Sequence, residues 1–181
     1  MKKIITILFL AVTVFACTSD KTELVNIKNQ YSVEVPAFLS KANNLHEDAS
    51  LQYQNALREF YVVVIDEPKS EFEAAVAETE FSGDLEGYTN ILHTSLKQSL
   101  GEANFSDIKS VRINGLNARK FTFEGTLENL PVVYQAAYIE GESHFYQIVS
   151  WTLQENKEKY KDHMHKIIES FKETSSSRSV K

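Results

Sequence analysis

Alternation of apolar and polar positions predicts most of the strands in this chain. The predicted strands are 24–27, 31–35, 49–54, 59–65, 111–113, 116–125, 132–140 and 144–153. In 31–35 every second side chain is apolar, which indicates a strand with one buried face. The run 60–65 is apolar at every position, which is typical of an interior strand covered on both faces.

Three segments have apolar residues at helical spacing instead. The first begins with the capping-box form Ser70-x-x-Glu73 and is broken at Gly83. The second spans 86–100, and Gly101 is placed to end it. The third spans 156–172 and carries a predicted buried stripe of Tyr160, Met164, Ile167, Ile168 and Phe171.

The order of these elements predicts the architecture. Asn114-Gly115 indicates a tight hairpin, because both residues tolerate the positive φ of a two-residue turn, and Gly141-Glu142 marks a second hairpin. A sheet that is apolar on both faces needs cover on both, which three amphipathic helices can supply. We therefore expect an α+β fold, an α/β/α sandwich around a twisted antiparallel sheet.

The N-terminus has the pattern of a signal peptide. Met1-Lys2-Lys3 is basic, and the twelve residues 4–15 are almost wholly apolar. As a helix they reach about 18 Å, too short for a hydrocarbon core of about 30 Å. The run Val14-Phe15-Ala16-Cys17 resembles the lipobox of bacterial lipoproteins.

That resemblance implies cleavage after Ala16, a diacylglyceryl thioether on Cys17 and acylation of the new N-terminus. The alternative is an ordinary secretory signal with a chance cysteine. Thr18, in place of Asp, favours the outer membrane over the inner one by the same resemblance. The expected organisation is a signal peptide (1–16), a lipidated tether (17–23), one domain (24–173) and a disordered tail (174–181).

Composition and charge exclude several classes. A chain of 181 residues with one Cys has neither a disulfide framework nor a Cys-based zinc site. The net charge of −6 has the wrong sign for a nucleic-acid binder. Removing residues 1–16 leaves 17 basic against 25 acidic side chains, a net charge of −8.

Much of this negative charge lies in 66–86. The segment has one basic residue, Lys69, and eight acidic ones, Asp66, Glu67, Glu71, Glu73, Glu78, Glu80, Asp84 and Glu86. It is interpreted as a solvated face, with a docking face for a partner protein and a hard-cation site as alternatives. No D-x-[DN]-x-[DN]-G spacing supports the cation site.

We find no catalytic, metal or nucleotide motif. His163 and His165 lie about 200° apart around a helix axis, so they cannot share one ion. G-x-S-x-G, H-E-x-x-H and glycine-rich phosphate loops are absent from the sequence. We expect no catalytic residue, metal or cofactor. We expect Tyr134, Tyr138 and Tyr146 to be core residues. If a helix leaves one sheet face open, they would instead line a groove on that face.

The arrangement resembles the PsbP-like superfamily, which includes DcrB-type bacterial lipoproteins. The residues that carry the resemblance are the strand 31–36 ending in Pro36, the hairpin 114–119, and 145–151 leading to the helix that ends 167–171. It covers about 24–173. The resemblance implies a non-enzymatic protein that docks to partners.

The function expected from the sequence is a non-catalytic, lipid-anchored envelope lipoprotein that binds a protein or ligand. A cryptic envelope hydrolase or redox enzyme and a purely structural envelope component are the alternatives. We expect a monomer, attached to the membrane through Cys17 and facing the periplasm or the exterior.

Overall fold

The computed structural model describes residues 21–27 and 29–174. The predicted signal peptide and Cys17 lie outside the described residues, as does the predicted tail apart from Thr174. The first strand begins at Thr22, so it includes two residues that the sequence assigns to the tether.

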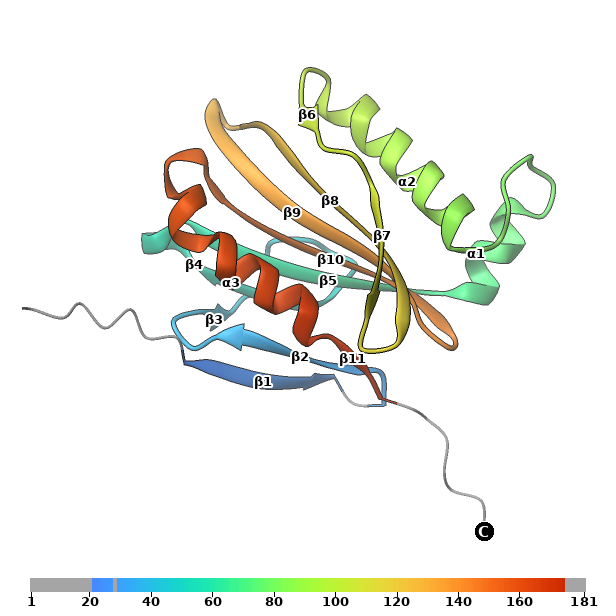
Figure 1. The fold of residues 1–181 in the computed structure, drawn as a ribbon, viewed down its shortest axis with the longest axis horizontal. Coiled ribbons are helices and arrows are strands. Elements are labelled where there is room, and N and C mark those ends of the chain that lie inside the picture. Colours follow the sequence, from blue (N-terminus) through green and yellow to red (C-terminus); the bar gives the residue numbers. More distant parts are fainter. Residues whose placement is uncertain (1–20, 28, 175–181) are drawn as a thin grey trace, which may run out of the picture.

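The strands form two antiparallel sheets (Figure 1). The small sheet has the order β1-β2-β11, formed by Thr22–Ile27, Tyr31–Pro36 and Lys172–Glu173. The large sheet has the order β3-β4-β5-β10-β9-β8-β6, and β7 also pairs with β8. Its strands are β3 (Ser40–Lys41), β4 (Ala49–Asn55), β5 (Phe60–Pro68), β6 (Asn104–Phe105), β7 (Lys109–Ile113), β8 (Leu116–Leu127), β9 (Leu130–Glu140) and β10 (His144–Leu153).

Helices lie on both faces of the large sheet, which confirms the predicted sandwich. On one face lie α1 (Lys69–Val76) and α2 (Leu85–Leu100), and on the other lies α3 (Lys157–Ser170), beside the small sheet (Figure 1). Two 3₁₀ turns, η1 (Ala56–Arg58) and η2 (Gln154–Asn156), join β4 to β5 and β10 to α3. The sequence patterns did not predict a second sheet.

Each face of the large sheet carries its own core. The predicted α3 stripe is buried against β2 and the central strands, as expected. On the opposite face Tyr88 of α2 stacks on Phe145 of β10 with ring centroids 4.4 Å apart. The two cores together bury apolar side chains on both sides of β8, β9 and β10.

The predicted hairpin at Asn114-Gly115 is confirmed, with φ of 48° and 91° in a two-residue turn between β7 and β8. The capping box at Ser70 was wrong. Helix α1 begins at Lys69 after Pro68, without a side-chain cap, and it ends at Val76. A residue inside the first turn cannot act as the N-cap, so Ser70 does not fill that position.

The side-chain cap is found on α2 instead. Asp84 accepts hydrogen bonds from the backbone N–H groups of Glu86 and Gly87. Only glycine fits at position 87, because a Cβ atom there would collide with the Ser82 carbonyl. The loop between α1 and α2 therefore folds tightly against the start of α2.

Candidate functional site

Five aromatic rings form a row across the face of the large sheet that carries α2. In order they are Phe105 (β6), Phe123 (β8), Tyr134 (β9), Trp151 (β10) and Tyr61 (β5). Neighbouring ring centroids are 5.1, 4.3, 6.1 and 5.2 Å apart. Each neighbour in the row is also the direct cross-strand partner, so the strand register builds the row.

Helix α2 covers only part of this row. Leu96 and Leu100 lie over Phe123 and Tyr134, and a small apolar cavity of about 180 Å³ remains beneath them. Trp151 forms a wall of this cavity and also of a larger cleft beyond the helix. Trp151 and Tyr61, at the end of the row, are half-buried, and Tyr61 lines the larger cleft but not the cavity beneath α2.

The larger cleft, of about 380 Å³, lies between this end of the row and the β8–β9 turn. Leu127 and Leu130 flank the turn and are 47% and 51% exposed. The lining consists of Asn44, Leu45, Glu59, Tyr61, Leu127, Glu128, Leu130, Val132, Trp151, Thr152 and Leu153. We call it the Trp151 cleft.

Two carboxylates, those of Glu59 and Glu128, give the lining of the Trp151 cleft a negative charge. The Tyr61 hydroxyl donates a hydrogen bond to Glu59 Oε2 at 2.7 Å. Burial, this hydrogen bond and the negative charges of Glu59 and Glu128 raise the pKa of Tyr61 to about 12. None of the described residues that line the cleft is basic, so these charges are not neutralised from within the lining.

Both hydroxyl groups in the lining are already engaged. Thr152 Oγ1 donates to the Glu59 carbonyl at 2.6 Å, and Tyr61 donates to the Glu59 carboxylate. At neutral pH the Tyr61 hydroxyl keeps its proton, because its pKa is raised.

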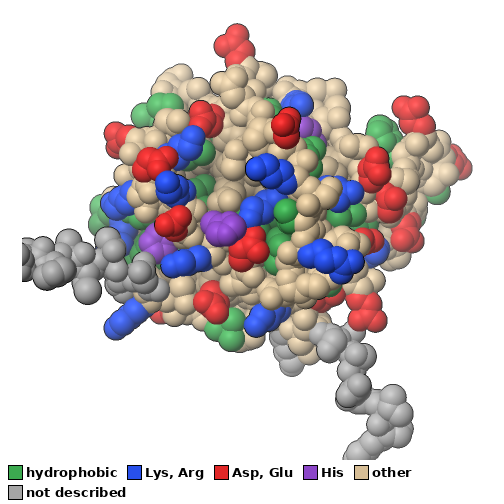
Figure 2. Space-filling view, viewed as in Figure 1, with side chains coloured by type: hydrophobic (Ala, Val, Ile, Leu, Met, Phe, Trp, Pro, Cys, Tyr) green, Lys and Arg blue, Asp and Glu red, His purple; other side chains and the backbone are tan. Residues whose placement is uncertain are grey.

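The predicted acidic segment lies at the other end of the molecule. Its residues follow the end of β5, α1, the α1–α2 loop and the start of α2, and Figure 2 shows acidic side chains gathered there. Asp66 accepts a hydrogen bond from Gln30. The Ser82 hydroxyl and the backbone N–H groups at the start of α2 lower the pKa of Asp84. Within 21–27 and 29–174, no group of three or more His, Cys, Asp or Glu side chains could hold a metal ion.

The two α3 histidines lie in different surroundings. His163 packs against Phe38, with ring centroids 5.3 Å apart, whereas His165 Nδ1 lies 3.0 Å from Lys120 Nζ. The His163 ring therefore covers part of the core.

The three candidate tyrosines do not share one groove. Tyr134 belongs to the aromatic row, while Tyr138 is buried beneath α2. Tyr146 lies on the opposite face, against Tyr31 and Phe171. Tyr61, Trp151 and the leucines of the β8–β9 turn were not predicted as site residues from the sequence. The one available signal was the exposed pattern Leu127-Glu128-Asn129-Leu130, in which two apolar residues flank a polar turn.

None of the helices in the part of the chain that the structure describes has the length and apolar character needed to cross a bilayer. No protein-family model matches the sequence, and no curated protein matches it either.

Solved structures do match the fold. The solution structure of cyanobacterial PsbP (CyanoP) from Synechocystis sp. PCC 6803 is similar with a TM-score of 0.60 and 10% identity, over 89% of this chain and 99% of that one. LpqN, described as involved in cell envelope biogenesis of Mycobacterium tuberculosis, is similar with a TM-score of 0.54 and 12% identity, over 85% of this chain and 91% of that one. At such low identity the likeness concerns the fold alone. The chain therefore has a PsbP-like fold.

Proposed function

We propose that this chain is a lipid-anchored, non-catalytic binding module of the bacterial cell envelope. Its anchor is the acylated Cys17 and its membrane is the outer membrane. The signal-peptide pattern and the lipobox-like run before Cys17 support this anchor. The fold shared with LpqN, which is described as involved in envelope biogenesis, is compatible with the location.

The observation that carries the binding role is the Trp151 cleft. Its volume of about 380 Å³ falls within the range of about 300–1,000 Å³ that is usual for small-molecule sites. Such sites combine apolar walls with a few polar groups that fix orientation. Here the walls are leucines and aromatic rings, and the polar groups are Glu59 and Glu128.

This chemistry selects an amphipathic ligand with a cationic head. An apolar chain would lie against Trp151, Leu127 and Leu130. An ammonium group would donate charge-assisted hydrogen bonds to Glu59 and Glu128, for which the lining supplies no basic competitor. A cryptic hydrolase that used one of these hydroxyl groups would need it activated. The Tyr61 hydroxyl keeps its proton at neutral pH because its pKa is raised to about 12, and the Thr152 hydroxyl donates to a backbone carbonyl, which is not a general base.

The first test is the anchor. In Cys17→Ala the acceptor of the diacylglyceryl group is lost, so we expect the protein to leave the membrane fraction, because stable attachment depends on the acyl chains. Fractionation of cells, together with the mass of the N-terminal peptide, measures both effects. Unchanged partitioning of Cys17→Ala and no acyl mass on the wild-type peptide would contradict the anchor.

The second test is the ligand class. Trp151 is the sole tryptophan, so its emission reports occupation of the cleft. Below its micelle concentration, dodecylammonium is expected to change that emission saturably, and dodecanoate, which has the same chain and the opposite charge, is not. Neutralising both carboxylates in Glu59→Gln/Glu128→Gln should weaken dodecylammonium binding by about tenfold or more.

Glu142→Gln is the matched control, because Glu142 is an exposed glutamate in the β9–β10 turn, away from the cleft lining. It should bind dodecylammonium like the wild type. Equal responses to the two amphiphiles, or equal losses in the control, would contradict the proposed ligand class.

A further inference from the structure

Exposed apolar side chains gather at one end of the domain. Among the described residues five large hydrophobic side chains are exposed, and three of them, Leu57, Leu127 and Leu130, surround the Trp151 cleft or adjoin its wall. Leu57 is 100% exposed at the 3₁₀ turn η1, two residues before Glu59. Exposed apolar groups that cluster in this way indicate an interaction surface. We call these three side chains the leucine tip.

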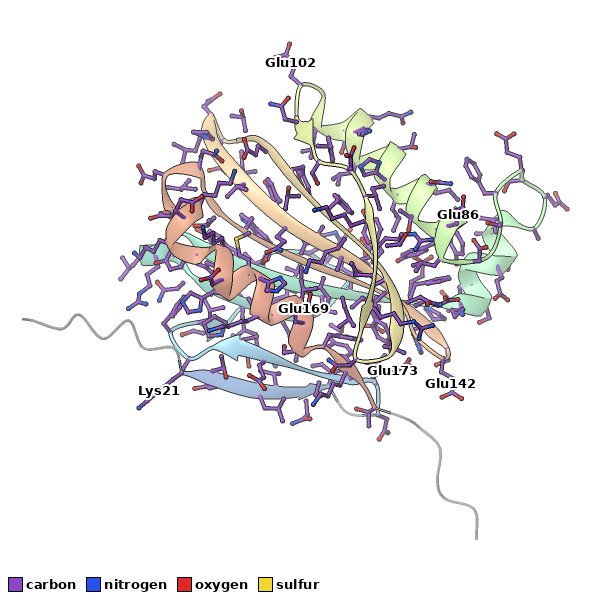
Figure 3. The ribbon with its side chains drawn as sticks, viewed as in Figure 1. Lys21, Glu86, Glu102, Glu142, Glu169 and Glu173 are labelled. Atoms are coloured by element: carbon purple, nitrogen blue, oxygen red, sulfur yellow. The ribbon has the colours of Figure 1, made fainter. Side chains whose placement is uncertain are left out.

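The N-terminal end of the described chain lies at the same end of the domain. The Lys21 carbonyl accepts a hydrogen bond from the backbone N–H of Ala37. Phe38, which follows Ala37, accepts a hydrogen bond through its carbonyl from the Asn55 side chain beside η1. The Arg58 guanidinium lies 4.6 Å from the centre of the Phe38 ring. Figure 1 shows the β8–β9 turn, the β4–β5 connection and the start of β1 along one edge, and Figure 3 shows Lys21 at that edge.

The distance to the anchor is short. Cys17 precedes Lys21 by four residues, and an extended chain spans at most about 3.6 Å per residue. Lys21 therefore lies within about 14 Å of the cysteine that the proposed function places at the bilayer surface. An anchor this close keeps the Lys21 end of the domain next to the lipid.

We infer that the leucine tip inserts into the interfacial layer of the bilayer that holds the anchor, an inference that rests on the proposed acylation of Cys17. Leucine side chains gain free energy when they leave water for acyl chains, and the anchor removes most of the entropic cost of bringing them there. Arg58, next to Leu57, adds a cation within reach of lipid phosphates. The mouth of the Trp151 cleft then opens at the membrane surface, so an amphiphile enters it directly from the bilayer.

Site-directed fluorescence on the full-length acylated protein tests this orientation. Leu57→Cys and Leu127→Cys each place a nitrobenzoxadiazole label on the tip, in protein reconstituted into vesicles of phosphatidylethanolamine and phosphatidylglycerol. Phe81→Cys is the matched control, because Phe81 is 41% exposed but lies in the α1–α2 loop at the far end of the domain. We expect the tip labels to shift to shorter wavelength and to be quenched by spin-labelled lipid, while the Phe81→Cys label stays in water.

Mass analysis of the N-terminal peptide from the same sample separates the two proposals. Acylated protein whose tip labels remain in water would overturn the insertion and leave the anchor standing. Unacylated protein would overturn the anchor and the insertion together. Tip labels that are already shielded before vesicles are added would indicate that two copies pair through the tip, and this would overturn the insertion. Equal quenching of the labels at all three positions would overturn it too.

Discussion

Two glutamates of the Trp151 cleft have backbone conformations that favour glycine. The φ of Glu59 is 50° and that of Glu128 is 51°, both in the left-handed region. This region costs a residue with a Cβ about 1–2 kcal/mol. Glu128 occupies the first position of a two-residue hairpin turn, where Asn and Gly are favoured. Unfavourable backbone geometry beside a cleft is consistent with carboxylates that serve binding at the expense of stability.

The substitution Glu128→Gly separates these two roles. Glycine removes the steric cost of the positive φ, but its greater freedom in the unfolded chain offsets part of this gain. The free energy of unfolding should therefore rise by about 0.5–1 kcal/mol. Dodecylammonium binding should weaken in the same variant, because one carboxylate is lost. Urea unfolding followed by circular dichroism measures the first effect.

Glu142→Gly is the control for this prediction, since Glu142 does not have a positive φ. There the glycine should leave stability unchanged or lower it. A Glu128→Gly variant that is less stable than the wild type would contradict the argument from backbone strain.

At the scale of elements, local patterns predicted the helices and most strands correctly. The α3 stripe and the Asn114-Gly115 turn depend on residues close in sequence, so the sequence alone identified them. The Trp151 cleft could not be predicted in this way. Its aromatic row needs β5 to pair with β10, which are separated by two helices and four strands in the chain. The separate small sheet likewise depends on β11 returning to β2 from the far end of the sequence.

The helix caps give a test at this scale. Asp84→Ala removes the acceptor for two N–H groups at the start of α2, so we expect a loss of about 1 kcal/mol in the free energy of unfolding. Ser70→Ala should have little effect, although the sequence pattern favoured Ser70 as the cap, because Ser70 lies inside α1. Chemical denaturation of both variants measures the difference, and a larger loss for Ser70→Ala would contradict the assignment of the caps.

At the scale of the whole molecule, the acidic segment and the leucine tip are separated. The acidic segment lies around α1, whereas the leucine tip and the start of β1 lie at the opposite end (Figures 1 and 2). With the tip toward the membrane, this separation keeps the acidic segment away from anionic lipid, which would repel it. The same orientation leaves the acidic segment facing the aqueous compartment.

The central claim is that the Trp151 cleft is the binding site, and backbone amide NMR of the domain during titration with dodecylammonium tests it most directly. We predict saturable shift changes at Tyr61, Leu127, Glu128 and Leu130 and at the indole N–H of Trp151, with little change in 66–86. Shift changes confined to the acidic segment 66–86, or none at the cleft at saturating ligand, would contradict the account.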